Sequence, residues 1–437
     1  MTPAVGYTEM KDSGVPWILS IPAHWKVCRL KDLFSFGKGL PITKADLIEH
    51  GIPVISYGQI HSKTNTGTHL SKELCRYVSE DYLRTNPTCV LQEGDIVLAD
   101  TSEDLEGLGN AALNDMPSTV FAGYHTIILR PIGKGFSKYC AYLFRSGSWR
   151  SQLRASASGI KVFSVTQRML RSCSVVLPPY DDMQRITDFL DTQCAKIDEI
   201  IAEVKASIED YKQWKESIIY EAVTKGLDPN AEMKDSGIEW IGNAPQRWKI
   251  KRVKALLSEV DVRSAEGIEE PLSMSQVLGI IPSSCISVAN PASSYVGCKI
   301  VKKGDLVLNK LKAHLGVFAV SGYEGIVSPD YAVYRAKEGT CVDFLELLFK
   351  TSRCITEFKK YITGVGAGLS RLYTKDLFNV RVAIPSLPEQ EFIVNTIKGK
   401  AKKIDALISE KRALIEDLSA YKKSLIYEVV TGKRRVC

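Results

Sequence analysis

The sequence predicts an α/β protein with two tandem-repeat α/β domains, separated by two long antiparallel coiled-coil helices and related by pseudo-twofold symmetry. Three observations predict this fold class. Apolar residues recur at alternating spacings of four and three along residues 181–224, as they do in a long amphipathic helix. The same pattern returns 207 positions later, along residues 388–431. The stretches that precede the two helices alternate short apolar runs with turns, in the same order both times.

The apolar stripe of the first helix follows a heptad pattern, which is typical of a helix that packs along another helix. Lys215 is the residue that interrupts this stripe. The second copy of the pattern supplies a partner within the same chain. The residues expected to form the contact between the helices are Ile197, Ile201, Val204, Ile208, Tyr211, Ile404, Ile408, Ile415 and Leu418.

The two helices are copies of one unit. Residues 196–224 and 403–431 are identical at 16 of 29 positions, including Lys-Ile-Asp at both starts and Ile-Tyr-Glu-x-Val-Thr at both ends. Their charges differ, because residues 181–226 hold six basic and eleven acidic residues whereas residues 388–437 hold eleven and seven. The two helices therefore carry net charges of opposite sign and are expected to attract each other.

A short motif opens each half of the chain. Residues 10–25 read Met-Lys-Asp-Ser-Gly-x-x-Trp and then Pro-x-x-Trp, and residues 233–248 repeat the pattern. Asp-Ser-Gly and proline predict loops, and the tryptophans are expected to anchor these loops on a packed surface. Base stacking on exposed tryptophans is the alternative interpretation. Because the repeat is cyclic, each motif is expected near the end of the other half's helix.

The rest of each half is expected to be a mixed α/β domain. In the first, strands are predicted at 52–57, 94–99, 125–130 and 175–177, and a helix at 137–153. In the second, strands are predicted at 304–309, 331–335 and 380–385, and a helix at 344–352. The expected boundaries are 1–180 for the first domain with its N-terminal motif, 181–225 for its helix, 226–387 for the linker and second domain, and 388–437 for the last helix.

Composition narrows the functional class. No apolar run approaches the ~20 residues of a membrane span, and the first residues do not resemble a secretion signal. The eleven cysteines are scattered without a Cys-x-x-Cys pair, which favours reduced thiols in a cytoplasmic protein. The six histidines show no metal-ligand spacing. Leu177-Pro178-Pro179-Tyr180 lacks the Asn or Asp that precedes the prolines in amino-methyltransferase sites, so we interpret it as the end of a strand.

The predicted arrangement suits a two-part site on duplex DNA. In an antiparallel pair each domain lies at the N-terminal end of its own helix, and 44 helical residues span at most ~65 Å. B-DNA advances ~34 Å per turn, so two modules held this way could address one face of a duplex. The residues outside the helices carry a net charge of +8, which is compatible with a polyanionic partner.

These motifs resemble the specificity subunit of type I restriction-modification systems. The resemblance rests on the repeated opening motif, Lys-Ile-Asp, Ile-Tyr-Glu-x-Val-Thr, and the helix starts after Leu-Pro-Pro and Ile-Pro-Ser-Leu-Pro-Glu-Gln, and it covers essentially the whole chain. The second helix start, Pro388-Glu389-Gln390, fits the family pattern, whereas Asp181-Asp182-Met183 departs from it.

The resemblance implies a DNA-binding subunit without catalytic activity, acting in host defence. Each target-recognition domain would read one half of a bipartite sequence, and the helices would set the spacer and dock two modification subunits. The modification subunits would bring S-adenosylmethionine for DNA methylation at adenine. A restriction and translocation subunit would use ATP and Mg²⁺. No cofactor is expected in this chain itself.

Candidate DNA contacts are expected in loops at the ends of strands. Arg and Lys side chains can read guanine, and Gln can read adenine. The candidates are Lys38, Tyr57, Gln59, Lys63, Arg150, Arg154 and Lys161 in the first domain and Gln276, Asn309, Lys310, Lys312, His314 and Arg371 in the second.

Three other functions stay open at this stage. The chain could be a helical scaffold that assembles proteins without reading DNA, or a self-contained DNA methyltransferase or nuclease. It could also read DNA through only one of its domains.

Overall fold

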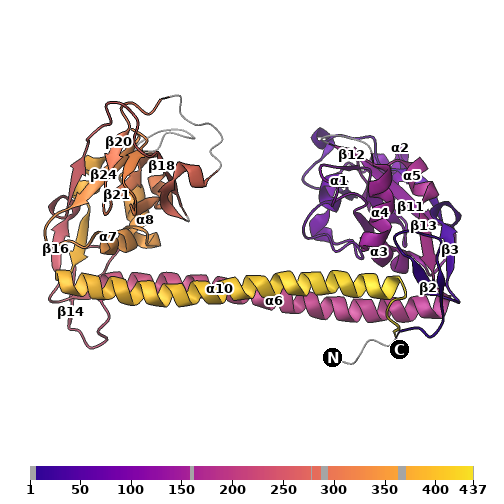
Figure 1. The fold of residues 1–437 in the computed structure, drawn as a ribbon. Coiled ribbons are helices and arrows are strands. Elements are labelled where there is room, and N and C mark those ends of the chain that lie inside the picture. The colour runs from indigo at the N-terminus through magenta and orange to yellow at the C-terminus, as the bar shows by residue number, and fades with distance from the viewer. Residues whose placement is uncertain (1–5, 158–161, 277, 287–293, 363–370, 437) are drawn as a thin grey trace. The chain divides into compact units, whose positions relative to one another are not determined.

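The computed structural model describes residues 6–157, 162–276, 278–286, 294–362 and 371–436 (Figure 1). The chain forms two compact units, of which the first holds residues up to 204 and from 413 onward, and the second holds residues 205–412. Two long helices, α6 (Tyr180–Lys225) and α10 (Leu387–Val430), each contribute one segment to each unit. α6 begins and ends within one residue of the heptad stretch 181–224, and α10 within one residue of its repeat 388–431, which confirms the repeat of the long helix. α10 ends at Val430, before the expected boundary at residue 437.

The first domain is built on an antiparallel sheet of order β4-β11-β7-β9. The bounds are β4 (Phe34–Lys38), β11 (Thr126–Pro131), β7 (Ile96–Ala99) and β9 (Ala111–Leu113). A second sheet has the order β10-β5-β6, with β10 (Phe121–Ala122), β5 (Ile52–Ile55) and β6 (Arg76–Val78). Smaller elements are β3 (Lys26–Arg29), which pairs with β13 (Ser174–Leu177), β8 (Thr101–Ser102), which pairs with β12 (Phe163–Ser164), and the helices α1 (Tyr57–Ile60), α2 (Tyr82–Thr85), α3 (Ser137–Arg145), α4 (Gly147–Ser156) and α5 (Gln167–Ser172).

The second domain repeats this order of elements. Its main sheet is β17-β24-β21-β22, also antiparallel, with β17 (Leu257–Val260), β24 (Tyr331–Ala336), β21 (Leu306–Asn309) and β22 (Phe318–Val320). The other strand pairs are β16 (Lys249–Arg252) with β25 (Arg381–Ile384), β18 (Leu272–Ser275) with β19 (Gly279–Pro282), and β20 (Lys299–Val301) with β23 (Gly325–Val327). The helices are α7 (Val342–Phe349), α8 (Ser352–Lys359) and α9 (Thr374–Asn379).

Two predicted elements are corrected by local capping. The single helix predicted over 137–153 is two helices, because Ser146 has an extended backbone and its hydroxyl accepts a hydrogen bond from Trp149 N at 3.3 Å. The strand predicted over 52–57 ends at Ile55, because Ser56 is the N-cap of α1. In both segments the apolar pattern predicts one continuous element. A serine that caps a helix ends that element earlier than the pattern predicts.

The opening motifs are hairpins rather than the predicted loops. β1 (Met10–Asp12) pairs with β2 (Ser20–Pro22), and β14 (Met233–Asp235) pairs with β15 (Asn243–Pro245). The closing tryptophans are anchors as predicted, since Trp25 is fully buried and Trp248 nearly so, but Trp17 is 37% exposed. In each hairpin the aspartate of Asp-Ser-Gly ends the first strand, and the glycine has a positive φ in the connection that follows.

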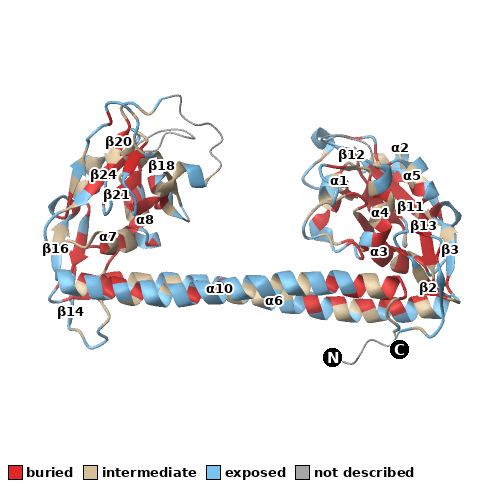
Figure 2. Ribbon diagram, in the orientation of Figure 1, coloured by how far each residue is buried: buried red, intermediate tan, exposed pale blue. Residues whose placement is uncertain are grey.

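Each hairpin packs on the end of the long helix from the other half, as the cyclic repeat predicts. In the first unit, Lys433 Nζ donates to Ser20 O at 2.7 Å, and Trp25 shares a core with the last turn of α10. In the second unit, the Tyr220 hydroxyl of α6 donates to Trp240 O at 2.9 Å. The cores of both units therefore continue from the domain onto the helices (Figure 2).

Each domain contains an equivalent ion pair whose carboxylate is buried. Asp95, whose side chain is fully buried, accepts hydrogen bonds from Arg130 at 2.7 to 3.1 Å. Asp305 accepts from Arg335 at 2.8 and 2.9 Å in the same place of the second domain. The glycine before each aspartate has a positive φ, which turns the chain into the strand. This explains why Gly-Asp precedes the same strand in both halves.

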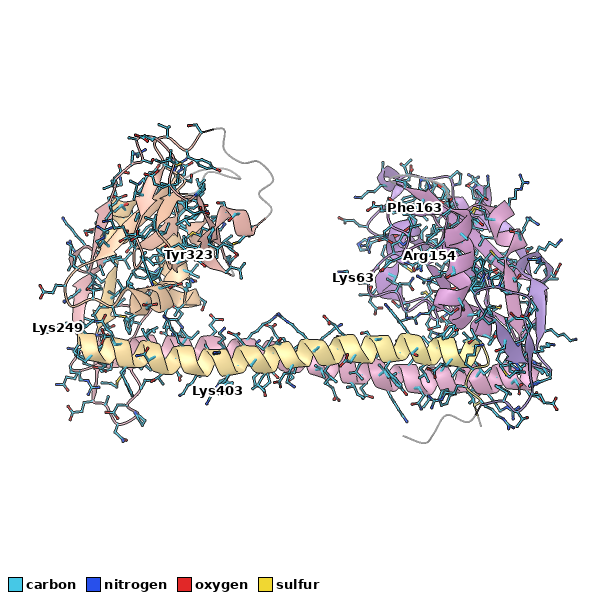
Figure 3. All side chains as sticks on the ribbon, viewed as in Figure 1. Lys63, Arg154, Phe163, Lys249, Tyr323 and Lys403 are labelled. Carbon is cyan, nitrogen blue, oxygen red and sulfur yellow. The ribbon has the colours of Figure 1, made fainter. Side chains whose placement is uncertain are left out.

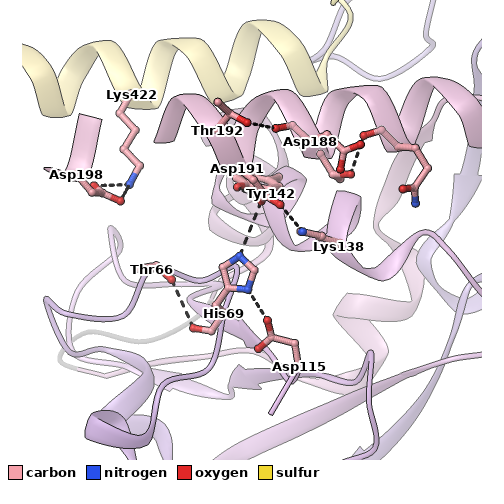
Figure 4. A network of polar contacts seen from close by, with 12 residues as sticks. Thr66, His69, Asp115, Lys138, Tyr142, Asp188, Asp191, Thr192, Asp198 and Lys422 are labelled. Atoms are coloured by element: carbon pink, nitrogen blue, oxygen red, sulfur yellow. Dashed lines mark hydrogen bonds and ion pairs between the residues drawn. The ribbon is translucent and has the colours of Figure 1, made fainter. Parts of the chain in front are cut away.

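The helices pair antiparallel within each unit through matching ion pairs. In the first unit, Lys422 of α10 contacts Asp198 of α6 at 2.6 Å (Figure 4). In the second unit, Lys215 of α6 contacts Asp405 of α10 at the same distance. Both aspartates belong to the Lys-Ile-Asp repeat. Lys215 can therefore occupy a position on the apolar stripe because it pairs with an acidic residue of the other helix. Lys422 and Asp198 are the repeats of Lys215 and Asp405, so the same ion pair forms in both units.

Each domain also contacts its own helix through an ion pair, but with opposite polarity. In the first unit, Lys138 of α3 pairs with Asp191 of α6, which also accepts a hydrogen bond from the Tyr142 hydroxyl at 2.7 Å (Figure 4). In the second unit, Asp343 of α7 pairs with Lys398 of α10. Lys398 of α10 is the repeat of Asp191 of α6. If the two domains exchanged helix segments, Lys138 would face Lys398 and Asp343 would face Asp191, so that like charges would meet. The polarity thus favours one pairing of domain and helix.

The equivalent carboxylate side chains at the starts of the two long helices differ in length by one methylene group. Glu389 accepts from Arg247 at 3.0 Å and from Trp248 Nε1 at 3.1 Å. Its repeat, Asp182, accepts from His24 Nε2 at 2.9 Å. Trp25 Nε1 is buried and finds no hydrogen-bond partner among the described residues. The departure from the family pattern at 181–183 therefore leaves one buried donor unpaired.

We predict that Asp182→Glu raises the thermal unfolding midpoint, because the longer side chain gives Trp25 Nε1 an acceptor. A satisfied buried donor contributes ~1 kcal/mol, which corresponds to ~2–4 °C for a unit of this size. Glu389→Asp is the matched control and should lower the midpoint by a similar amount. Differential scanning calorimetry measures both, and equal midpoints in all three proteins would contradict the account.

Candidate nucleic-acid interface

The strand ends of the first domain gather on one side. Tyr57, which follows β5, packs edge-on against His125 before β11, with ring centroids 5.4 Å apart. His125 Nδ1 lies 3.3 Å from Oδ1 of Asp100, the residue after β7. β8 and β12 continue the same region (Figure 1). Loops from four separate segments therefore present side chains together, and such loops on a rigid sheet are suited to reading a ligand surface.

The sequence candidates of the first domain divide into two groups. Lys63 (Figure 3) and Lys38 are both exposed. Tyr57 is half-buried in the aromatic contact. Gln59 Oε1 accepts from Ser56 N at 3.0 Å and so closes the capping box of α1. Lys161 lies outside the described residues. The exposed lysines are free to meet phosphates, whereas the oxygen of Gln59 is engaged locally.

Arg150 and Arg154 of α4 hold the loop that follows β8. Arg150 donates to Glu106 O at 2.9 Å and to Phe144 O at 3.1 Å, and Arg154 donates to Leu105 O at 2.9 Å. Burial, together with the neighbouring guanidinium groups, lowers the pKa of Arg150 to about 10. Its guanidinium remains charged at neutral pH. The contacts with the chain give both side chains a role in shaping this loop.

The candidates of the second domain lie around η7 (Lys310–Leu315), directly after β21. Asn309 is buried, and its Oδ1 accepts from Leu311 N at 3.2 Å, which caps this short helix. Gln276 is exposed and donates to Leu315 O at 3.4 Å. Lys312 is exposed, and His314 Nδ1 is buried without a hydrogen-bond partner among the described residues.

The remaining two candidates form an electrostatic cluster. Arg371 contacts Asp330 at 3.2 Å. Burial lowers the pKa of Lys310, and the nearby Lys299 lowers it further. Sequence reasoning missed the acidic partners Asp100 and Asp330, and also His125 and Tyr124. All four lie at strand ends, but the sequence candidates favoured basic and amide side chains. The one signal available was position, since Asp100, Tyr124 and Asp330 lie directly beside a predicted strand and His125 is the first residue of one.

The predicted contacts between the helices are partly buried. Ile197, Ile208, Ile404 and Ile408 are buried at 2 to 7% exposure. The half-buried members are Ile201, Val204, Tyr211, Ile415 and Leu418. Lys411 Nζ lies 5.6 Å from the centroid of the Tyr211 ring, which adds a cation–π contact.

In the described parts of the chain, no cluster of three or more His, Cys, Asp or Glu side chains is arranged to hold a metal ion.

Comparison with known proteins decides the family. The model of the type I restriction modification DNA specificity domain matches residues 22–210 and 273–417, which together make up most of the chain. The chain belongs to this family of type I specificity subunits.

Similar proteins agree with this assignment. The putative type I restriction enzyme MjaX specificity subunit of Methanocaldococcus jannaschii is 23% identical over 430 residues, covering 95% of both chains. The type I restriction enzyme EcoKI specificity subunit of Escherichia coli strain K12 is 19% identical and covers 94% of this chain and 90% of its own. A solved chain from work on complex assembly and conformational transition of the type I R-M system has a TM-score of 0.65 at 16% identity. The match covers 94% of the present chain and 98% of the solved chain, and it shows that the two have the same fold.

The two matched segments follow the repeat, because each begins in or before a domain and ends inside the long helix after it. The family match thus covers both sets of strand-end loops. Of the helices that the structure describes, none is long and apolar enough to cross a membrane.

Proposed function

We propose that this specificity subunit reads a bipartite DNA sequence, with residues 1–180 and 226–387 forming its two target-recognition domains. One observation carries the proposal: the domains have equivalent main sheets and equivalent ion pairs, Asp95–Arg130 and Asp305–Arg335, yet present different side chains at the strand ends. A common scaffold with different loops is what two distinct half-sites require. Phosphates would meet the exposed lysines, and the loops would supply base contacts.

The long helices would set the number of unread base pairs between the half-sites. Support comes from the ion pairs Lys422–Asp198 and Lys215–Asp405, which hold the register of the two helices in each unit. A lysine on an apolar stripe favours the register that gives it a partner. A fixed register is the property that a spacer of constant length needs.

We expect that replacing residues 249–387 with the corresponding domain of another specificity subunit changes one half-site only. The complex reconstituted with its modification subunits would be used to select from randomised duplexes, and the bound sequences would be read. The half-site of the first domain should persist, because its loops lie within the other unit. A change in both half-sites, or in neither, would contradict a division of reading between the domains. A wild-type complex that selects no two-part sequence would favour a helical scaffold.

The partners would be two modification subunits, which bring S-adenosylmethionine and methylate adenine, and a restriction and translocation subunit that uses ATP and Mg²⁺. The helices carry a repeated exposed feature that supports two identical partners. Ile200 and Tyr421 are 44% and 40% exposed in the first unit, and their repeats Leu407 and Trp214 are 39% and 54% exposed in the second. In the sequence, one member of each pair lies two residues after the aspartate of its unit's Lys–Asp bridge, and the other directly precedes the lysine.

These exposed pairs are suited to docking because large apolar side chains carry much of the energy of protein interfaces. Their surroundings repeat as well. Lys196, Glu203 and Asp417 are exposed around the first pair, and Lys403, Glu410 and Asp210 are exposed around the second. The same apolar centre and the same charges would therefore meet the same partner surface twice.

We predict that Trp214→Ala with Leu407→Ala removes one of the two modification subunits from the complex. Loss of a hot spot of this kind costs ~2 kcal/mol or more, which is ~30-fold in affinity. Native mass spectrometry should then find one modification subunit per chain, and none when Ile200→Ala and Tyr421→Ala are added. Gln213→Ala is the matched control on the same exposed helix surface. Retention of both subunits in the fourfold variant would exclude this docking surface.

A further inference from the structure

Two positions at the strand ends are equivalent in the two domains by backbone register, but they carry side chains of different charge. Ala99 of β7 pairs with Thr126 of β11, and Asn309 of β21 pairs with Tyr331 of β24. The next residue outward on each strand is therefore equivalent in the two domains. These residues are Asp100 with His125 in the first domain and Lys310 with Asp330 in the second.

A third residue completes the equivalence. Val165 N donates to Asp100 O at 2.7 Å, and Leu372 N donates to Lys310 O at 3.3 Å. The residues just before these donors, Ser164 and Arg371, therefore occupy matching places. The first domain combines an acid, a histidine and a hydroxyl at the three positions, and the second combines a base, an acid and a base.

In each domain, two of the side chains at these positions contact each other. His125 Nδ1 lies 3.3 Å from Asp100 Oδ1, and the hydroxyl of Thr101 donates to the same carboxylate oxygen at 2.7 Å. In the second domain, Arg371 lies 3.2 Å from Asp330 Oδ1. Both clusters remain open to solvent, since the side chains of His125 and Asp330 are 59% and 51% exposed. The clusters are ordered by their neighbours, but they are not buried in the core.

The backbone at His125 is strained. Its φ is +55°, and among the described residues Leu19 is the other non-glycine residue with a positive φ. Asp100 N donates to His125 O at 3.1 Å, and the rings of Tyr57 and Tyr124 pack edge-on against the imidazole at 5.4 and 6.0 Å. These contacts hold a conformation that an ordinary loop residue avoids. Strain of this kind is concentrated at ligand-contacting sites, and here it points an exposed side chain outward without serving the core.

We propose that Asp100 and His125 in the first domain, and Lys310, Asp330 and Arg371 in the second, are specificity-determining residues of their half-sites. The first cluster offers a carboxylate acceptor, which suits the exocyclic amino group of cytosine or adenine. The second offers cationic donors, which suit the O6 and N7 acceptors of guanine. The inference rests on the proposed function and deepens it, because it assigns opposite hydrogen-bonding character to the two halves.

Substitutions that preserve the backbone test the first cluster. His125→Asn keeps a residue that tolerates positive φ, and Asp100→Asn replaces an acceptor by a group that also donates. The reconstituted complex would be used to select from randomised duplexes, with His50→Asn as the control for an exposed histidine elsewhere in this domain. We expect base preference at one or two neighbouring positions of one half-site to change about tenfold, while the other half-site and the control stay the same.

The second cluster gives the reciprocal experiment. Arg371→Gln and Asp330→Asn should change positions in the other half-site only, and discrimination for guanine should fall about tenfold in Arg371→Gln. Variants that bind as strongly as the wild type and select the wild-type sequence would overturn the inference and leave the proposed function intact. An equal weakening on all sequences would overturn it as well, because it would assign these residues to phosphate contact. A wild-type complex without a two-part preference would remove the proposed function itself.

Discussion

The Lys–Asp bridges between α6 and α10 are the constraint on which the rest of the structure depends. Lys422 and Lys215 stand on the apolar stripes of the helices, and each is accommodated because an aspartate of the other helix lies 2.6 Å away. A slip of one helical turn would move each partner by ~5.4 Å and leave a lysine facing apolar side chains. The bridges therefore contribute more to the register than to the strength of the helix contact.

The two halves of the repeat have the same fold but carry different side chains at the strand ends that are proposed to contact DNA. The buried carboxylates of Asp95 and Asp305 both keep an arginine partner, because a buried carboxylate without a partner is costly. Half-buried positions at the strand ends are free of that constraint, and there Asp100 is replaced by Lys310 in the second domain. The ion pairs between each domain and its helix are reversed as well, which keeps the two units from exchanging their domains.

The helices and most main strands could be predicted from the sequence, because heptad spacing and the internal repeat depend on local patterns. The break at Ser146 and the hairpin at Met10–Asp12 were missed, since they depend on single capping and turn hydrogen bonds. At the candidate interface, the sequence marks which loops follow strands but not which side chains are engaged. Arg150 could not be recognised as a loop-holding residue, because its partner carbonyls come from segments 6 and 44 positions away.

The most direct measurement of the central claim is the spacer selected by a subunit with longer helices. A seven-residue heptad would be inserted after Ala206 and after its repeat Ala413, so that both stripes stay in phase. Each helix gains ~10 Å, which matches about three base pairs of B-DNA. We expect unchanged half-sites with a spacer about three base pairs longer in the sequences that the reconstituted complex selects. An unchanged spacer, with both half-sites still read, would show that the helices do not set the distance.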